Sequence, residues 1–151
     1  MREQLKRELK NKCIAIIEKR ISAIRLAMEE AQYAANNEEK SSAGDKYETS
    51  RAMSHLEKNM QATQLAANLL VLKALFSVNC EIVHNTVQKG SFVTCDTMSF
   101  FIIAGLGKLI FNNEEVLAVS PNAPVARLLL GKKPGDHIIF NNKKLEIKSV
   151  F

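Results

Sequence analysis

Four carboxylates lie close together in the sequence, on either side of a short polar break. Glu38 and Glu39 precede the break, and Asp45 and Glu48 follow it. Asp45 and Glu48 are three positions apart, so on a helix they would share a face. Mg²⁺ takes oxygen ligands and keeps several waters, so one or two such carboxylates can contribute to a shared magnesium site but hold the ion poorly alone. The alternative is that Asp45 caps a helix and the other acids are solvated surface.

Two long stretches that flank this break carry apolar or small residues in alternating steps of three and four. This spacing is a heptad seam and predicts two long helices. The first seam comprises Ile14, Ile17, Ile21, Ile24, Met28, Ala31 and Ala35. The second comprises Thr49, Met53, Leu56, Met60, Thr63, Ala67, Leu70 and Ala74. Because the break is short, we expect an antiparallel coiled-coil hairpin over residues 1–77 with its tip at 36–48; two arms of a larger bundle are the alternative.

The net charge of +5 is unevenly distributed along this hairpin. Residues 1–28 hold eight Lys/Arg against three Glu, a net charge of +5, and residues 29–48 hold six acids against two Lys, a net charge of −4. The expected tip is therefore acidic and the rest of the chain basic. Charged coiled-coil exteriors are common, and no sequence-specific DNA binding is expected from the basic part.

Residues 78–151 have a different pattern, with short β-rich runs separated by turn formers. A linker is expected at about 77–91, and the single predicted helix starts at Ala123 or Pro124 and ends at Leu130, before Gly131. Asn141-Asn142 predicts a hairpin turn. Strands are expected at 92–95, 99–104, 108–111, 116–119, 137–140 and 143–150. The fold class is therefore α+β, with a helical hairpin followed by a small antiparallel β domain.

The composition excludes several classes of protein. The 151 residues are 46% hydrophobic and 25% charged, too apolar for a disordered chain. No run approaches the roughly 18 apolar residues of a membrane span. With no secretory signal apparent, we expect a cytoplasmic protein with reduced thiols and no membrane partner. The cysteines and histidines lack metal-ligand spacing; they are Cys13, Cys80, Cys95, His55, His84 and His137.

The segment from Leu117 to Asp136 closely resembles the C-terminal signature of the Gre-type bacterial transcript-cleavage factors. The matching residues are Ser120, Pro121, Pro124, Arg127, Leu129, Leu130, Gly131, Lys132, Gly135 and Asp136. The order of the parts and the total length are also similar to that family. The resemblance implies that the β domain is FKBP-like and docks on RNA polymerase, and that the hairpin enters the secondary channel of the polymerase.

The same resemblance points to residues for each role. It assigns docking to Ser120, Pro121, Asn122, Ala123, Pro124, Arg127 and Lys132, for which turn and capping chemistry is the alternative. Aligned on Tyr47, the sequence has Lys40 and Ala43 where cleavage-stimulating members carry acids. Asp45 and Glu48, and after them Glu38 and Glu39, are the acids left to assist catalysis. Tyr47 would stack on a nucleotide or pack the tip.

The function implied is a transcription elongation factor that stimulates cleavage of backtracked nascent RNA. It would meet the RNA 3′ end at its tip and would not be an enzyme itself. No cofactor is expected beyond Mg²⁺ shared in the polymerase active site, and the chain is expected to be a monomer. The alternatives are a non-cleaving regulator in the same channel, an adaptor that dimerises through its coiled coil, and a peptidyl-prolyl isomerase. The isomerase is suggested by the resemblance of the β domain alone, and fold does not carry activity.

Overall fold

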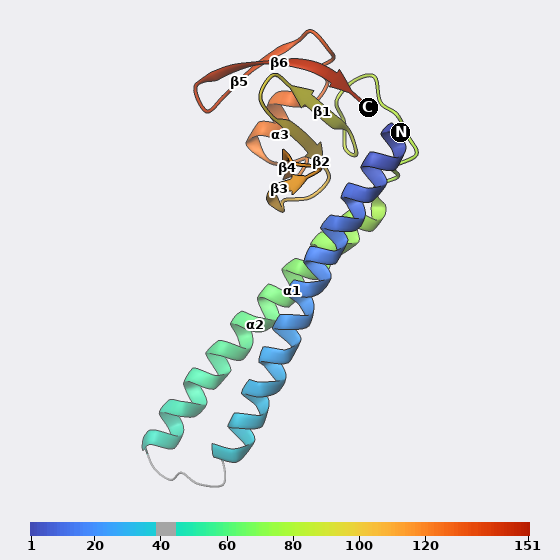
Figure 1. Ribbon diagram of the computed structural model, residues 1–151. Coiled ribbons are helices and arrows are strands. Elements are labelled where there is room, and N and C mark those ends of the chain that lie inside the picture. The colour runs from blue at the N-terminus through green and yellow to red at the C-terminus, as the bar shows by residue number, and fades with distance from the viewer. Residues whose placement is uncertain (39–44) are drawn as a thin grey trace. The chain divides into compact units, whose positions relative to one another are not determined.

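The structure is a computed structural model. It describes the backbone of residues 1–38 and 45–151 and the side chains of residues 1–37 and 48–151. The described chain has two long helices followed by a β domain with one short helix, which confirms the α+β class (Figure 1). It divides into two compact units. The hairpin unit is residues Ala15–Leu72, and the β unit combines Met1–Ile14 with Lys73–Phe151.

The helices α1 (Arg2–Glu38) and α2 (Asp45–Ser77) have 37 and 33 residues. Neither contains Gly or Pro, so nothing interrupts their backbone hydrogen bonds. Within the hairpin unit the two helices run side by side (Figure 1). Ile17 and Ile21 are buried, and Ile24, Met28, Ala31 and Ala35 are half-buried. The predicted seam of α1 is therefore confirmed.

The predicted seam of α2 is wrong. Met53, Leu56, Met60 and Leu70 are all more than half exposed, and Thr49, Thr63 and Ala67 are exposed as well. The half-buried positions of α2 belong to a neighbouring face, and in the hairpin unit they include Ser50, Ser54, Gln61, Leu65, Asn68 and Leu72. Periodicity locates the apolar face of a helix correctly, but it does not say which face the partner helix covers.

The β domain is one six-stranded sheet in the order β3-β4-β2-β1-β6-β5. Its strands are β1 (Phe92–Cys95), β2 (Ser99–Ile102), β3 (Gly107–Phe111), β4 (Glu114–Val119), β5 (His137–Phe140) and β6 (Lys143–Val150). Four of the pairings are antiparallel, but β2 and β4 pair in parallel. The expectation of an antiparallel sheet is corrected on this point: β3 occupies the edge of the sheet, so the chain runs out along β3 and returns in β4 with the direction of β2.

Two tight turns and one helix end depend on backbone conformations that few residues tolerate. Asn112-Asn113 and Asn141-Asn142 have φ between 51° and 63°, the left-handed pair of a type I′ hairpin turn. Only the second turn was predicted. The helix α3 (Pro124–Leu129) begins at Pro124 and is followed by Gly131 with φ of 80°, as expected from the sequence.

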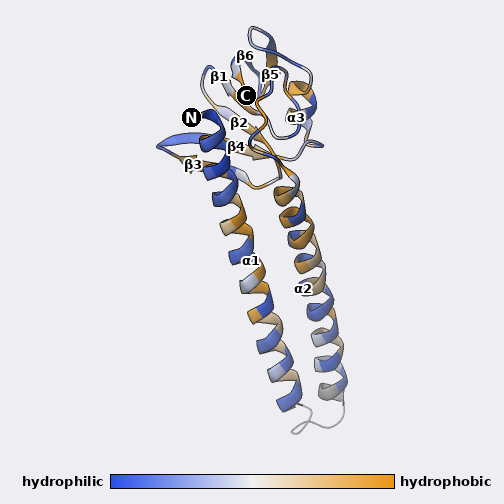
Figure 2. Cartoon of the chain, turned by 90° about the vertical axis from the view of Figure 1, so that its right-hand side faces the viewer, coloured by the Kyte–Doolittle hydropathy of each residue, from blue (hydrophilic) through white to orange (hydrophobic). Residues whose placement is uncertain are grey.

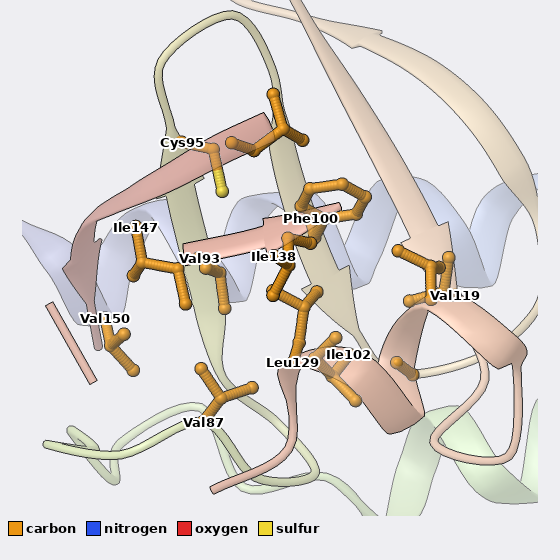
Figure 3. Close-up of a cluster of buried hydrophobic side chains, with 13 residues drawn as sticks. Val87, Val93, Cys95, Phe100, Ile102, Val119, Leu129, Ile138, Ile147 and Val150 are labelled. Carbon is orange, nitrogen blue, oxygen red and sulfur yellow. The ribbon is translucent and has the colours of Figure 1, made fainter. Parts of the chain in front are cut away.

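The core of the β unit lies between the sheet and α3. Figure 3 shows side chains from β1, β2, β5, β6 and α3 gathered in one apolar cluster. Val125, Ala126 and Leu129 are the buried face of α3. Phe100, which is fully buried, meets Phe140 edge-on with ring centroids 5.7 Å apart. This packing fixes where α3 and the loop before it are presented.

The first fourteen residues, which the sequence assigns to the hairpin, belong to the β unit. Leu9 and Cys13 are fully buried there. Lys6 Nζ donates to the carbonyl of Ile82 at 2.7 Å, and Lys10 Nζ donates to that of Val78, also at 2.7 Å. Arg7 forms an ion pair with Glu81, Lys12 Nζ donates to the carbonyl of Ile110, and the guanidinium of Arg2 lies 5.2 Å from the ring centre of Phe151. Many of the N-terminal cations therefore interact with other groups of the β unit.

Candidate functional site

The expected tip falls largely outside the described residues. Glu39 lies in the undescribed segment, and Glu38, Asp45 and Tyr47 lie at helix ends whose side chains are not described. Glu48, one turn into α2, is described and exposed. Whether the four acids meet, and whether Tyr47 packs beside them, remains a prediction from the sequence.

The loop before α3 is a hydrogen-bonded turn on the surface of the β unit. The N–H of Ala123 donates to the carbonyl of Ser120 at 3.0 Å, and the N–H of Asn122 donates to Ser120 Oγ at 3.2 Å. The serine hydroxyl thereby stabilises the turn. Asn122 and Pro124 are exposed, whereas Ser120, Pro121 and Ala123 are half-buried. The turn therefore exposes Asn122 and Pro124, while its other members are partly covered.

The residues singled out after this loop divide into exposed and structural positions. The side chain of Arg127 is exposed and makes no hydrogen bond or ion pair within the described part of the chain. Lys132 is half-buried, and its carbonyl accepts the N–H of Val87 at 2.8 Å while the N–H of Gly131 donates to the carbonyl of Val87, also at 2.8 Å. The end of α3 is thus bonded to segment 78–91. Arg127 is therefore an exposed cation, whereas the backbone of Lys132 helps to hold the end of α3 in place.

Sequence reasoning missed two apolar residues on the same surface. Leu128 is 47% exposed and Leu130 is 38% exposed, and they flank the buried Leu129. The sequence places the three consecutive leucines in or at the end of one short helix, and a helix as short as α3 turns only one of them inward. The exposed face of the loop and α3 therefore combines Asn122, Pro124 and Arg127 with Leu128 and Leu130. We call these five residues the α3 surface.

A cavity of about 400 Å³ lies between α1 and α2 in the hairpin unit. Ser50 and Ser54 of α2 line it opposite Ala31 and Ala35 of α1, and these small side chains leave the space open. Its wall also includes charged and polar groups, among them Glu29, Arg51, His55, Lys58 and Gln61. Gln61 Oε1 is buried without a hydrogen-bond partner. The sequence did not predict this cavity, because the seam expected for α2 would have filled it.

The described residues include no metal centre or reactive thiol. No group of three or more His, Cys, Asp or Glu among them could hold a metal ion. The three cysteines are free and buried, and burial raises the pKa of Cys13 and of Cys95 to about 11. Such thiols are inert at neutral pH. As far as the chain is described, neither long helix is apolar enough over a sufficient length to cross a bilayer.

No protein-family model and no curated protein matches the chain. Among solved structures, the chain is similar to one described as the structure of the transcription factor Gfh1. The sequence identity is 14%, the TM-score is 0.35, and the match covers 91% of this chain and 92% of that chain. A TM-score this low does not establish a shared fold.

Proposed function

We propose that this chain is a transcription elongation factor that docks on RNA polymerase through the α3 surface and places its helical hairpin in the secondary channel. The observation that carries the proposal is the placement of the Gre-like signature. The segment that carries the signature forms one turn, helix and turn, in which Val125, Ala126 and Leu129 are buried and Asn122, Pro124 and Arg127 are exposed. The exposed Arg127 side chain, beside two exposed residues of the turn, is available to a binding partner.

The hairpin unit is long and consists of two helices. Residues 15–38 of α1 and 45–72 of α2 correspond to about 36 Å and about 42 Å of helix at 1.5 Å per residue. This part of the chain ends in the acidic segment, and the signature lies in the other unit. The signature and the acidic segment therefore belong to different units of the chain.

The chemistry proposed for the tip is assistance to a metal centre that belongs to the polymerase. Mg²⁺ bound there would activate water for hydrolysis of backtracked RNA. Asp45 and Glu48, with Glu38 and Glu39 as further candidates, would supply one or two carboxylate ligands or hydrogen-bond acceptors for that water. In this proposal the polymerase catalyses the cleavage, and the chain contributes carboxylates near the RNA 3′ end.

Cleavage of nascent RNA in a stalled, backtracked elongation complex tests the proposal. We expect Mg²⁺-dependent shortening of the RNA 3′ end, and we expect the double change Asp45→Asn and Glu48→Gln to reduce its rate at least tenfold without weakening binding. Glu57→Gln is the matched control, because Glu57 is an exposed acid farther along α2. Cleavage that survives the double change would show that these acids are not the ligands.

Docking is tested separately by binding to the polymerase. Arg127→Ala should weaken binding about tenfold or more, as expected for an exposed arginine at the centre of an interface. Lys144→Ala, an exposed cation on β6, should leave binding unchanged. Binding without cleavage would favour the non-cleaving regulator. That alternative is consistent with Lys40 and Ala43, which stand where cleavage-stimulating members carry acids. Absence of binding would refute both forms of the proposal.

A further inference from the structure

The face of α2 that α1 leaves uncovered is an apolar stripe. We define the outer stripe as Met53, Leu56, Met60, Thr63, Ala67 and Leu70, all within the hairpin unit. Its four large side chains are 57–68% exposed. Scattered apolar residues on a surface need no explanation, but a continuous row on one helix face does.

The spacing of the outer stripe specifies the kind of partner. Its steps are 3, 4, 3, 4 and 3, the heptad spacing with which one helix packs along another. Residues 59–72 contain no Asp, Glu, Lys or Arg, and Figure 2 shows the part of α2 toward Ser77 as mainly hydrophobic. The charged groups that keep a solvent-facing helix hydrated are missing there. The partner is therefore expected to be a helix with a matching apolar seam.

We propose that the outer stripe binds the same stripe of a second copy, with the two α2 helices antiparallel. In that pairing the heptad position a of one helix faces position d of the other. Two of the three layers then place a long side chain against a shorter one, which fills space evenly. Parallel pairing would instead stack Leu56 on Leu56 and leave Ala67 facing Ala67. The antiparallel layers are Met53 with Leu70, Leu56 with Ala67, and Met60 with Thr63.

The flanking residues permit this pairing. Glu57 would lie beside Gln64 of the second copy, and Asn59 would lie beside Ala66, so no like charges meet. Each of the four large side chains of the stripe is more than half exposed and can bury roughly 60–120 Å² of apolar surface. A pair would therefore bury well under the roughly 1,200 Å² at which stable interfaces begin. We expect a weak, reversible dimer that forms only at high protein concentration.

This inference goes beyond the proposed function, because it concerns the free protein and is tested without polymerase. It is an alternative to the monomer expected from the sequence, and the experiment below distinguishes the two. That expectation took the seam of α2 to be covered by α1, whereas in the structure α1 faces Ser50, Ser54 and Leu65 instead.

Sedimentation equilibrium over a range of concentrations tests the association. We expect a shift from one to two chain masses, and Leu56→Gln should weaken it about tenfold or more, since each dimer loses two apolar contacts. Leu26→Gln is the matched control, because Leu26 is 56% exposed on α1 and Leu56 is 63% exposed on α2. Circular dichroism verifies that both variants keep their helix content. A monomer at every concentration, or equal weakening by both variants, would overturn the proposal.

Spin labels on Ala52→Cys test the orientation, and the buried native cysteines leave the new thiol as the accessible one. Antiparallel pairing puts the two labels about 30 Å apart along the helix axis, and parallel pairing puts them about 10–15 Å apart. A short distance would overturn the antiparallel register. The absence of any intermolecular distance would overturn the dimer itself.

Discussion

Leu9→Ala should destabilise the β unit, although Leu9 lies in a helix that the sequence assigns to the hairpin. The side chain is fully buried, and residues 1–14 form one compact unit with residues 73–151. The substitution removes three carbons from this contact and leaves a cavity. If Leu9 packed only along a free hairpin, the loss would be small, so the variant distinguishes the two arrangements.

The expected loss in free energy of unfolding follows from the burial of Leu9. Core Leu→Ala changes cost about 2.7–5.0 kcal/mol, which combines the lost transfer free energy with the cavity. Leu26, on the same helix, is 56% exposed, so Leu26→Ala should cost less than about 1 kcal/mol. Since both variants gain the same helix propensity from alanine, the expected difference in free energy of unfolding is at least about 2 kcal/mol.

Urea denaturation measures this difference. The chain has no tryptophan, so far-ultraviolet circular dichroism follows the helices, and amide hydrogen exchange of β1 and β6 follows the sheet. We expect Leu9→Ala to speed exchange in the sheet and Leu26→Ala to leave it unchanged. Equal destabilisation by both variants, with no effect on the strands, would refute the assignment of residues 1–14 to the β unit.

Three further predictions concern single groups of the β unit. Burial first, and the Lys6 ammonium second, lower the pKa of His84 from 6.5, so the unfolded chain binds the proton more readily than the folded chain does. The free energy of unfolding should therefore be constant above about pH 6.5 and decrease as the pH falls below that value. His84→Gln should remove this decrease, as measured by urea denaturation at a series of pH values. Cys13 and Cys95 should resist maleimide at neutral pH until the chain unfolds, and rapid labelling detected by mass spectrometry would contradict their burial. Asn142→Ala should cost about 1 kcal/mol, because alanine tolerates the φ of 63° poorly, whereas Asn142→Gly should not lower the thermal midpoint.

The sequence predicted the features that depend on neighbouring residues. Uninterrupted helix formers predicted α1 and α2, β-rich runs predicted the strands, and Asn141-Asn142 predicted a hairpin turn that the backbone adopts. Pro124 and Gly131 bounded α3 correctly. Each of these features depends on the backbone preferences of a few neighbouring residues, which can be read from the sequence. The exposure of the loop before α3 follows from the same local chemistry.

Tertiary structure decided which surfaces are covered. The heptad of α2 was visible in the sequence, but only packing turned Ser50 and Ser54 toward α1 and left Met53 and Leu56 outside. Likewise, Lys6 read as a solvated charge, yet it is buried and bonded to the carbonyl of Ile82. The parallel pairing of β2 with β4 joins segments separated by a whole strand. A sequence pattern shows which face of an element is apolar, but which distant segment covers that face depends on the shape and volume of both surfaces.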